Sequence, residues 1–257
     1  MLSQDFPKLP SFRLNGRRAL ITGAGRGIGM ASALALAEAG ANLTLIARSK
    51  MEIEDVAREA RKHGVTAATI PLDITDSKAV QSVIADLEPF EILINSAGTN
   101  KPALLVETDM DDLDAVMNLN VRSTFAVTKA VVKGMVGARK GGSIVTISSQ
   151  MGHVGGVKRS VYCATKHGIE GMTKALSWEL GSHGIRINTI CPTFIETKMT
   201  SPMLADPEFR GYVEARIALG RIGKLEDLMG AVVFLCSDAA SMVTGSALMV
   251  DGGWTSI

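Results

Sequence analysis

Several features that are scarce in this chain of 257 residues exclude whole classes of protein. There are only three cysteines, Cys163, Cys191 and Cys236, an odd number at wide spacings. Such spacing provides neither a disulfide framework nor a Cys/His ligand pattern, so we expect a reducing compartment and no metal site. The chain also has no apolar run that approaches the ~20 residues of a membrane span.

An excess of either charge is missing as well. The chain carries 27 basic and 26 acidic residues, a net charge of +1, without a long run of one sign. A surface dedicated to nucleic acid or to an anionic membrane would need such a run, so we expect neither partner. Residues 1–16 have no apolar signal core and no arginine-rich transit pattern. We therefore expect a cytoplasmic protein with an irregular N-terminal lead-in at 1–16.

What the sequence does contain is a repeated alternation of short apolar runs and longer helical patterns. Strands are predicted at the apolar runs, which are 18–22, 42–47, 66–72, 92–94, 143–147, 185–190 and 247–250. Helices are predicted at 27–39, 50–62, 76–87, 102–116, 121–137, 161–182 and 226–235. The strands are apolar on both faces, which suits a parallel sheet covered by helices on both sides. Right-handed β-α-β connections then predict a Rossmann-like, doubly wound α/β fold.

This alternation indicates one domain that extends from residue 17 to residue 257. We find no linker, low-complexity tract or repeat in it. The segment 193–223 interrupts the alternation, because it is poorly periodic and rich in Met and Pro. We expect a small helical insertion there.

A glycine-rich loop, T-G-A-G-R-G-I-G at 22–29, joins the first strand to the first helix. Glycines permit a tight turn and a close approach of the backbone to a ligand. The helix N-terminus that follows favours negative charge, so the loop suits the pyrophosphate of a dinucleotide. Taken alone, the segment also fits a strand–helix turn without a ligand, and its place after the first strand favours the binding interpretation.

Tyr162 and Lys166 are four residues apart in a predicted helix, so they share one face of it. A neighbouring cation favours the phenolate and lowers the pKa of a tyrosine from about 10. Such a pair can act as a general acid or base. The same spacing also occurs by chance on exposed helix faces. Ser148 and Ser149 end a predicted strand at the sheet edge where open α/β sheets bind ligands, and either hydroxyl could stabilise charge on a substrate oxygen.

Together these motifs resemble the short-chain dehydrogenase/reductase family, from about Phe12 to Trp254. The resemblance is carried by the loop at 22–29, by N-S-A-G at 95–98, by Y-x-x-x-K at 162–166 and by the strand and turn at 250–254. Ser96 replaces the second asparagine of the family's N-N-A-G. Thr193 stands where the family has a glycine after Pro192, and it lacks the conformational freedom of glycine.

The resemblance implies an NAD(P)-dependent oxidoreductase. Such an enzyme transfers a hydride between nicotinamide and a carbonyl or secondary alcohol of ketone, polyol, sugar-acid or 3-oxoacyl type. The implied catalytic residues are Asn120, Ser149, Tyr162 and Lys166, with Ser149 placed by its spacing of 13 residues before Tyr162. Asn120 would hold a helix open and order a water, and Asn118 is the alternative position for this role. By residue type alone, either asparagine also fits a helix N-cap. The alternative function is a catalytically silent nucleotide-binding regulator, against which the intact catalytic set argues.

The cofactor expectation is NADP(H), with NAD(H) possible. Ala47 ends the second strand where an NAD-specific enzyme of this fold offers an acidic residue to the ribose. Arg48 and Arg26 could hold a 2′-phosphate, although both could also be solvated loop residues. The full expected cofactor-binding set is Gly23, Gly25, Arg26, Gly27, Ile28, Gly29, Arg48, Asp73, Ile74, Asn95, Ala97, Gly98, Tyr162, Lys166, Pro192, Ile195 and Thr197.

Three further expectations concern the substrate side and the assembly. Met199 and Met203 are candidates either for a substrate lid or for core packing. His153, four residues after Ser149, is a candidate for lining the substrate pocket. The resemblance of residues 251–254 and the apolar face of the helix at 161–182 predict a homotetramer.

Overall fold

A seven-stranded parallel sheet forms the centre of the protein, with the strand order β3-β2-β1-β4-β5-β6-β7. The structure is a computed structural model that describes residues 6–256. The strands are β1 (Arg18–Thr22), β2 (Asn42–Ala47), β3 (Ala67–Pro71), β4 (Ile92–Asn95), β5 (Gly142–Ile147), β6 (Ile185–Pro192) and β7 (Ala247–Val250). The order reverses between β1 and β4, which is where doubly wound sheets bind their ligands. The predicted fold class is confirmed.

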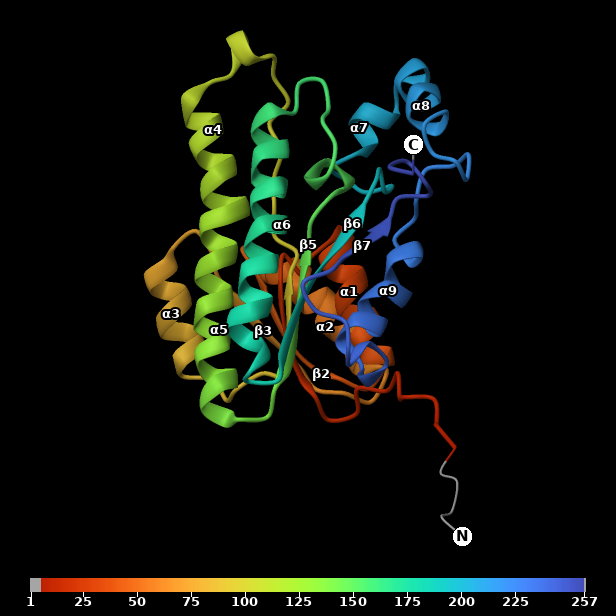
Figure 1. Ribbon diagram of the computed structural model, residues 1–257. Coiled ribbons are helices and arrows are strands. Elements are labelled where there is room, and N and C mark those ends of the chain that lie inside the picture. The colour runs from red at the N-terminus through yellow and green to blue at the C-terminus, as the bar shows by residue number, and fades with distance from the viewer. Residues whose placement is uncertain (1–5, 257) are drawn as a thin grey trace.

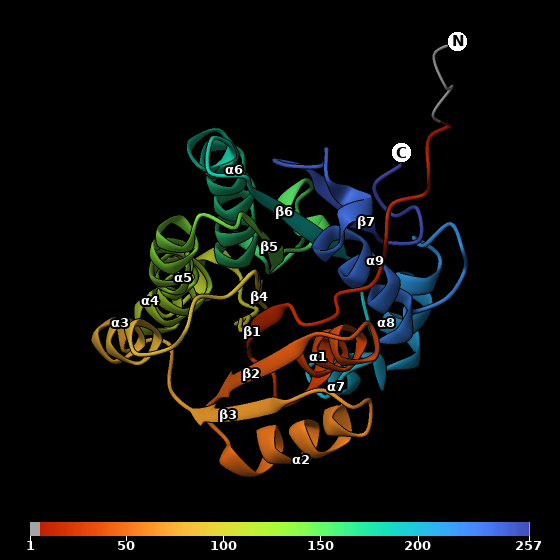
Figure 2. The ribbon, with the colours of Figure 1, turned by 90° about the horizontal axis from the view of Figure 1, so that it is seen from below.

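Helices cover both faces of the sheet (Figures 1 and 2). One layer consists of α1 (Gly27–Glu38), α2 (Lys50–Arg61) and α9 (Glu226–Cys236). The other consists of α3 (Ser77–Ala85), α4 (Met110–Met117), α5 (Thr124–Ala138) and α6 (Ser160–Gly181). Successive strand residues point to opposite faces. Ile21 therefore belongs to the apolar cluster on the side of α1, whereas Leu20 belongs to the cluster on the side of α5. This explains why the strands are apolar throughout.

Two predicted helices begin elsewhere than the sequence suggested. The helix predicted over 102–116 starts at Met110, because the Asp109 side chain caps it by accepting a hydrogen bond from the backbone of Asp111 at 2.7 Å. A short 3₁₀ turn, Leu105–Glu107, lies before it. The helix predicted from 121 is continuous with α4 through a π-helical stretch, Asn118–Ser123. Both asparagines of this stretch therefore lie inside a helix, and the N-cap interpretation is wrong.

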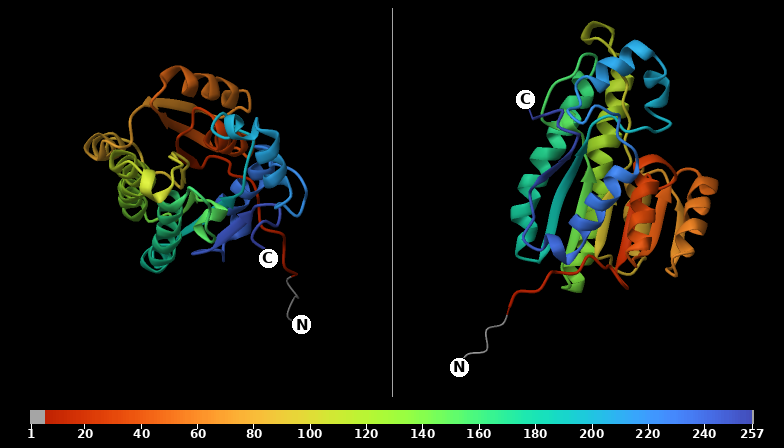
Figure 3. Two further views of the ribbon diagram at one scale, coloured as in Figure 1. Left: turned by 90° about the horizontal axis from the view of Figure 1, so that it is seen from above. Right: turned by 90° about the vertical axis from the view of Figure 1, so that its right-hand side faces the viewer.

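The segment 193–223 holds two short helices, α7 (Ser201–Leu204) and α8 (Pro207–Glu214). They share a small apolar cluster, which includes Val213 and Ile217, with partly buried Trp254 packed against it. Figure 3 shows this insertion and the turn before α4 rising above the same end of the molecule, where the parallel strands end. Elements from distant parts of the chain thus lie over the same edge of the sheet.

The described part of the N-terminal lead-in, residues 6–16, has no helix or strand, but it packs onto the domain. Leu14 is fully buried, and the Phe12 ring lies 6.4 Å from the Phe234 ring of α9. Among the described residues, no helix combines the length and apolarity needed to cross a membrane.

Candidate active site

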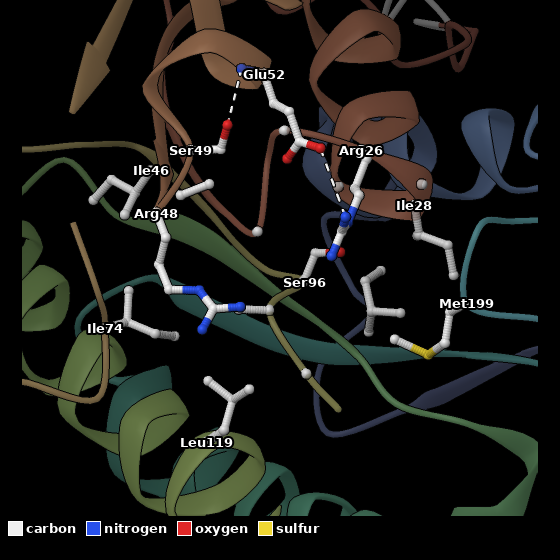
Figure 4. A pocket seen from close by; sticks show the side chains of 18 of the residues that line it. Arg26, Ile28, Ile46, Arg48, Ser49, Glu52, Ile74, Ser96, Leu119 and Met199 are labelled. Atoms are coloured by element: carbon white, nitrogen blue, oxygen red, sulfur yellow. Dashed lines mark hydrogen bonds and ion pairs between the residues drawn. The ribbon is translucent and has the colours of Figure 1, made fainter. Parts of the chain in front are cut away.

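A cavity of about 510 Å³ opens at the point where the strand order reverses (Figure 4). Its volume lies in the range of ligand sites, about 300–1,000 Å³. Most of the expected cofactor residues line it, namely Gly23, Gly25, Arg26, Gly27, Ile28, Gly29, Arg48, Asp73, Ile74, Ala97, Gly98 and Thr197. Lining residues that the sequence did not single out for cofactor contact are Ile46, Ser49, Glu52, Leu72, Thr75, Leu119, Ile147 and Lys198. Ser96 and Met199 also line it.

At two positions, the backbone of the glycine loop leaves no room for a side chain. Gly23 has φ +65°, and a Cβ there would lie 2.8 Å from the Cα of Ala97. A Cβ on Gly29 would lie 2.2 Å from the carbonyl oxygen of Gly23. The N-terminus of α1 has no side-chain cap, since Arg26 at the cap position makes no such hydrogen bond. Its free N–H groups therefore face the cavity and fit a pyrophosphate.

The cavity ends between α1 and α2 at a group of charged side chains. Arg26 and Glu52 point toward one another, with Nη1 and Oε1 3.6 Å apart (Figure 4). Ser49 caps α2 by accepting a hydrogen bond from the backbone of Glu52 at 3.3 Å. Arg48 extends into the cavity on the side of Ile74. Glu52 was not predicted from the sequence, although its place in the first turn of α2 was an available signal.

Asp73 lies two residues beyond the end of β3. Its carboxylate accepts a hydrogen bond from the backbone N–H of Thr75 at 2.9 Å. This hydrogen bond is the main reason why the pKa of Asp73 is lowered, and the nearby Arg48 adds to it. Asp73 is therefore an anion at neutral pH, and Ile74 beside it is buried.

Tyr162 and Lys166 lie on successive turns of α6. The Lys166 ammonium donates a hydrogen bond to the carbonyl oxygen of Ile147 at 2.8 Å and lies 5.5 Å from the centroid of the Tyr162 ring. Burial lowers the pKa of Lys166 to about 8. Burial also raises the pKa of Tyr162 to about 12, and the nearby Ser149 hydroxyl and the charge of Arg159 oppose this rise. The expectation that Lys166 lowers the pKa of Tyr162 is therefore wrong, because burial of the phenol outweighs every lowering effect.

The two candidate serines face different surroundings, because successive residues of an extended chain point in opposite directions. The Ser149 hydroxyl lies near enough to the Tyr162 phenol to lower its pKa, and it accepts a hydrogen bond from the backbone of Met151 at 3.1 Å. The Ser148 hydroxyl is buried beside Cys191 and has no satisfactory hydrogen-bond partner within residues 6–256. The structure therefore brings Ser149, and not Ser148, to the tyrosine.

Asn120 connects the π-helical stretch to two other parts of the site. Its amide oxygen accepts a hydrogen bond from the backbone of Thr99 at 2.9 Å, and its amide nitrogen donates to the carbonyl oxygen of Thr99 at the same distance. The amide nitrogen also lies 3.2 Å from the hydroxyl of Thr165, the neighbour of Lys166. One buried amide thus holds together the loop after β4 and helix α6.

Comparison with known proteins agrees with this geometry. A family model described as enoyl-(acyl carrier protein) reductase matches residues 23–255. Gluconate 5-dehydrogenase of Gluconobacter oxydans (strain 621H) is 40% identical over 248 residues, which cover 95% of this chain and 96% of the relative. The 3-oxoacyl-[acyl-carrier-protein] reductase of Thermotoga maritima is also 40% identical over 248 residues, or 94% of this chain and 98% of the relative. The chain belongs to the short-chain dehydrogenase/reductase family.

The structural comparison supports the same assignment. The crystal structure of a gluconate 5-dehydrogenase from Burkholderia cenocepacia J2315, in complex with NADP and tartrate, has a TM-score of 0.92 and 35% sequence identity. The match covers 97% of this chain and 99% of that one. This short-chain dehydrogenase/reductase is an NAD(P)-dependent oxidoreductase that transfers a hydride between nicotinamide and a carbonyl or secondary alcohol. The alternative of a catalytically silent regulator is not supported.

Some expected residues of this dehydrogenase/reductase do not line the cavity. Asn95 is buried and donates hydrogen bonds to the hydroxyls of Thr128 at 2.9 Å and Thr146 at 3.4 Å, so it braces β4. Pro192, the last residue of β6, and Ile195, three residues beyond it, are both buried. Tyr162 and Lys166 do not line the cavity either, although the Lys166 ammonium donates a hydrogen bond to the backbone of the lining residue Ile147.

A polar cluster that sequence spacing could not reveal lies beside Ser148. The Cys191 thiol donates to the carboxylate of buried Glu170 at 3.3 Å and lies 3.5 Å from Nε2 of His153. The Thr189 hydroxyl donates to the same carboxylate at 2.9 Å. Burial, with the adjacent carboxylate, raises the pKa of Cys191 to about 12. The thiol is therefore protonated and satisfies Glu170, and His153 contacts this cluster.

Proposed function

We propose that this enzyme interconverts ketones and secondary alcohols of polyhydroxylated substrates, sugar acids first among them, with NADP(H) as the preferred cofactor. The observation that carries the proposal is the meeting of Ser149, Tyr162 and Lys166 at the ends of β5 and α6, next to a dinucleotide-sized cavity. Relatives named gluconate 5-dehydrogenase, L-xylulose reductase and D-erythrulose reductase support the substrate class. The free thiols are compatible with work in the cytoplasm.

The cavity and its surroundings offer suitable residues for each part of the cofactor. The free N–H groups of α1 and the glycine loop would bind the pyrophosphate. Arg48 and Arg26 would bind the 2′-phosphate, and Asp73 with Ile74 would flank the adenine. Ala97, Gly98, Ile195 and Thr197 would surround the nicotinamide end. When bound, the cofactor supplies or accepts the hydride.

Side chains of the protein itself would transfer the proton. With a pKa of about 12, the Tyr162 phenol keeps its proton at neutral pH and can donate it to a carbonyl oxygen during reduction. The Ser149 hydroxyl would hold that oxygen. Lys166, held by Ile147, would bind the nicotinamide ribose and favour the phenolate as it forms. Asn120 would keep the π-helical stretch in place and order a water for proton exchange.

The test is a spectrophotometric screen of NADPH oxidation with keto sugars and keto sugar acids. Tyr162→Phe should lose at least ~100-fold in kcat while still binding NADPH, because only the proton donor is removed. The matched control is Tyr212→Phe, since Tyr212 is the second of the two tyrosines and is exposed on α8. Normal turnover by Tyr162→Phe would contradict its proposed role, and a wild type that reduces no carbonyl compound would contradict the proposed function.

A further inference from the structure

Arg159 is an unusual cation near the catalytic tyrosine. It precedes the first turn of α6, three residues before Tyr162, and its side chain is only 9% exposed. Burying a charge is costly unless it is paired. Within residues 6–256, however, no carboxylate comes within ion-pair distance of this guanidinium. The titratable groups that act on it are the Tyr162 phenol and the Cys163 thiol.

The contacts that Arg159 does make are poor substitutes for an anion. Its Nη1 donates to the carbonyl oxygen of Lys158 at 3.3 Å, and its Nη2 lies 3.3 Å from the sulfur of Met203 in α7. A thioether sulfur is a weak acceptor, and a guanidinium has five N–H donors in a planar fork. Burial accordingly lowers the pKa of Arg159. The guanidinium remains charged and is available to a better acceptor.

Three other cations around the strand ends and in the insertion already have acidic partners. Lys101 pairs with Asp112 at 3.1 Å, and Arg26 pairs with Glu52. Arg210, in the insertion, binds both Glu196 and Glu214 at 3.0 Å. Arg159 combines burial, a lack of acidic partners in the described chain and a place between Tyr162 and the insertion helix α7.

We propose that Arg159 binds the carboxylate of an anionic substrate whose carbonyl or hydroxyl group reacts at Tyr162. This inference rests on the proposed function, because a sugar acid carries a carboxylate on the same short chain as its reacting carbon. The carboxylate would replace the sulfur of Met203 and form a charge-assisted, bidentate contact with the planar fork. Arg159 is thereby a specificity-determining residue for acids over neutral polyols.

The experiment compares pairs of ligands that differ in one group. Gluconate and sorbitol differ by a carboxylate in place of a hydroxymethyl group, and so do 5-ketogluconate and L-sorbose. Dissociation constants of gluconate and sorbitol are measured calorimetrically on enzyme loaded with NADPH, a combination that cannot react. Values of kcat/KM are measured for the two ketones with NADPH.

Arg159→Gln should weaken gluconate binding and lower kcat/KM for 5-ketogluconate by about tenfold to a hundredfold, the value of a hydrogen bond to a charged group. The values for sorbitol and L-sorbose should change by less than about threefold, because these ligands offer no anion to the lost charge. Arg159→Lys, which keeps the charge but loses the fork, should lie between. The control is Arg216→Gln, which removes an exposed guanidinium stacked on Tyr212 at the end of the same insertion.

Two outcomes would overturn the inference while leaving the proposed function intact. In the first, Arg159→Gln keeps the wild-type preference for the acids. In the second, its affinity and kcat/KM fall equally for the acids and for the neutral ligands, as a purely structural role of Arg159 would require. If Arg159→Gln fails to fold, the same comparison is decided on Arg159→Lys. A wild type that reduces neutral ketoses without any preference for acids would instead refute the sugar-acid part of the proposed function.

Discussion

Replacing Arg48 by alanine should remove most of the preference for NADP(H). Arg48 and Arg26 both line the cavity at the end where the 2′-phosphate would lie, but their surroundings differ. Arg26 shares its charge with Glu52 at 3.6 Å. No carboxylate within residues 6–256 comes within 4.0 Å of the Arg48 guanidinium, so we expect Arg48 to be the stronger phosphate ligand.

The size of the effect follows from the kind of contact that is lost. A hydrogen bond to a charged group contributes about 1.5–3 kcal/mol. At about 1.4 kcal/mol per decade, kcat/KM for NADPH should fall by about ten- to a hundredfold. The value for NADH should change by less than about threefold, because a free 2′-hydroxyl gives this guanidinium only a neutral acceptor.

Glu52 allows a second change with the opposite sign. Glu52→Gln frees Arg26 and removes a negative charge from the phosphate end of the cavity. Exposed ion pairs are worth about 0.2–1 kcal/mol, so kcat/KM for NADPH should rise by at most about fivefold. Ser49 should still cap α2, since its hydroxyl contacts the backbone of Glu52.

The assay is kcat/KM for NADPH and for NADH with one ketone substrate. Arg58→Ala is the matched control, because Arg58 lies on α2 with a side chain that is 70% exposed and pairs there with Asp55. A wild type that uses NADH as well as NADPH would refute the reasoning from Ala47, Arg48 and Arg26. If kcat/KM of the Arg48→Ala variant falls equally for NADPH and NADH, Arg48 supports the fold of the loop and does not bind the 2′-phosphate.

Three further predictions concern pH, packing and assembly. The Lys166 ammonium, whose pKa is about 8, loses its proton as the pH rises through that value. The kcat/KM for NADPH should therefore fall above about pH 8. A kcat/KM that stays constant up to pH 10 would exclude Lys166 as a charged cofactor ligand. Gly29→Ala, whose new Cβ would lie 2.2 Å from the Gly23 oxygen, should destabilise the protein by about 1–3 kcal/mol in urea unfolding. Gly137→Ala in α5, where a Cβ meets nothing within 4 Å, should instead stabilise it by about 0.5–1 kcal/mol; equal effects would refute the packing argument. Light scattering should show a homotetramer at micromolar concentration, supported by Trp178, which is 90% exposed on α6 and available to a second subunit, and a monomer would refute this.

Much of the architecture could be read from local patterns. The strand predictions at 18–22 and 42–47 coincide with β1 and β2, because a strand buried on both faces must be apolar throughout. The glycine loop was readable as well, since its backbone path tolerates no side chain at Gly23. The pairing of Tyr162 with Lys166 follows from helical spacing alone. Each of these features depends on residues that are close in the sequence.

Other features were decided by residues that are distant in the sequence. Ser148 and Ser149 are equivalent as residue types, and only the position of α6 shows which hydroxyl meets Tyr162. The π-helical stretch around Asn120 has no pattern of its own, because it depends on the contact of that side chain with Thr99 and Thr165.

The electrostatics of the site also needed the tertiary structure. The pKa of Tyr162 was expected to fall beside Lys166, yet burial raises it, and burial is a property of the packed chain. Glu52 reaches Arg26 only because α2 packs beside the glycine loop. Arg159 has no acidic partner in the described part of the chain, and a sequence cannot show which charges the fold leaves without one. Local spacing thus determined which chemistry the chain could perform, whereas the packing of distant segments decided the surroundings in which each charged group acts.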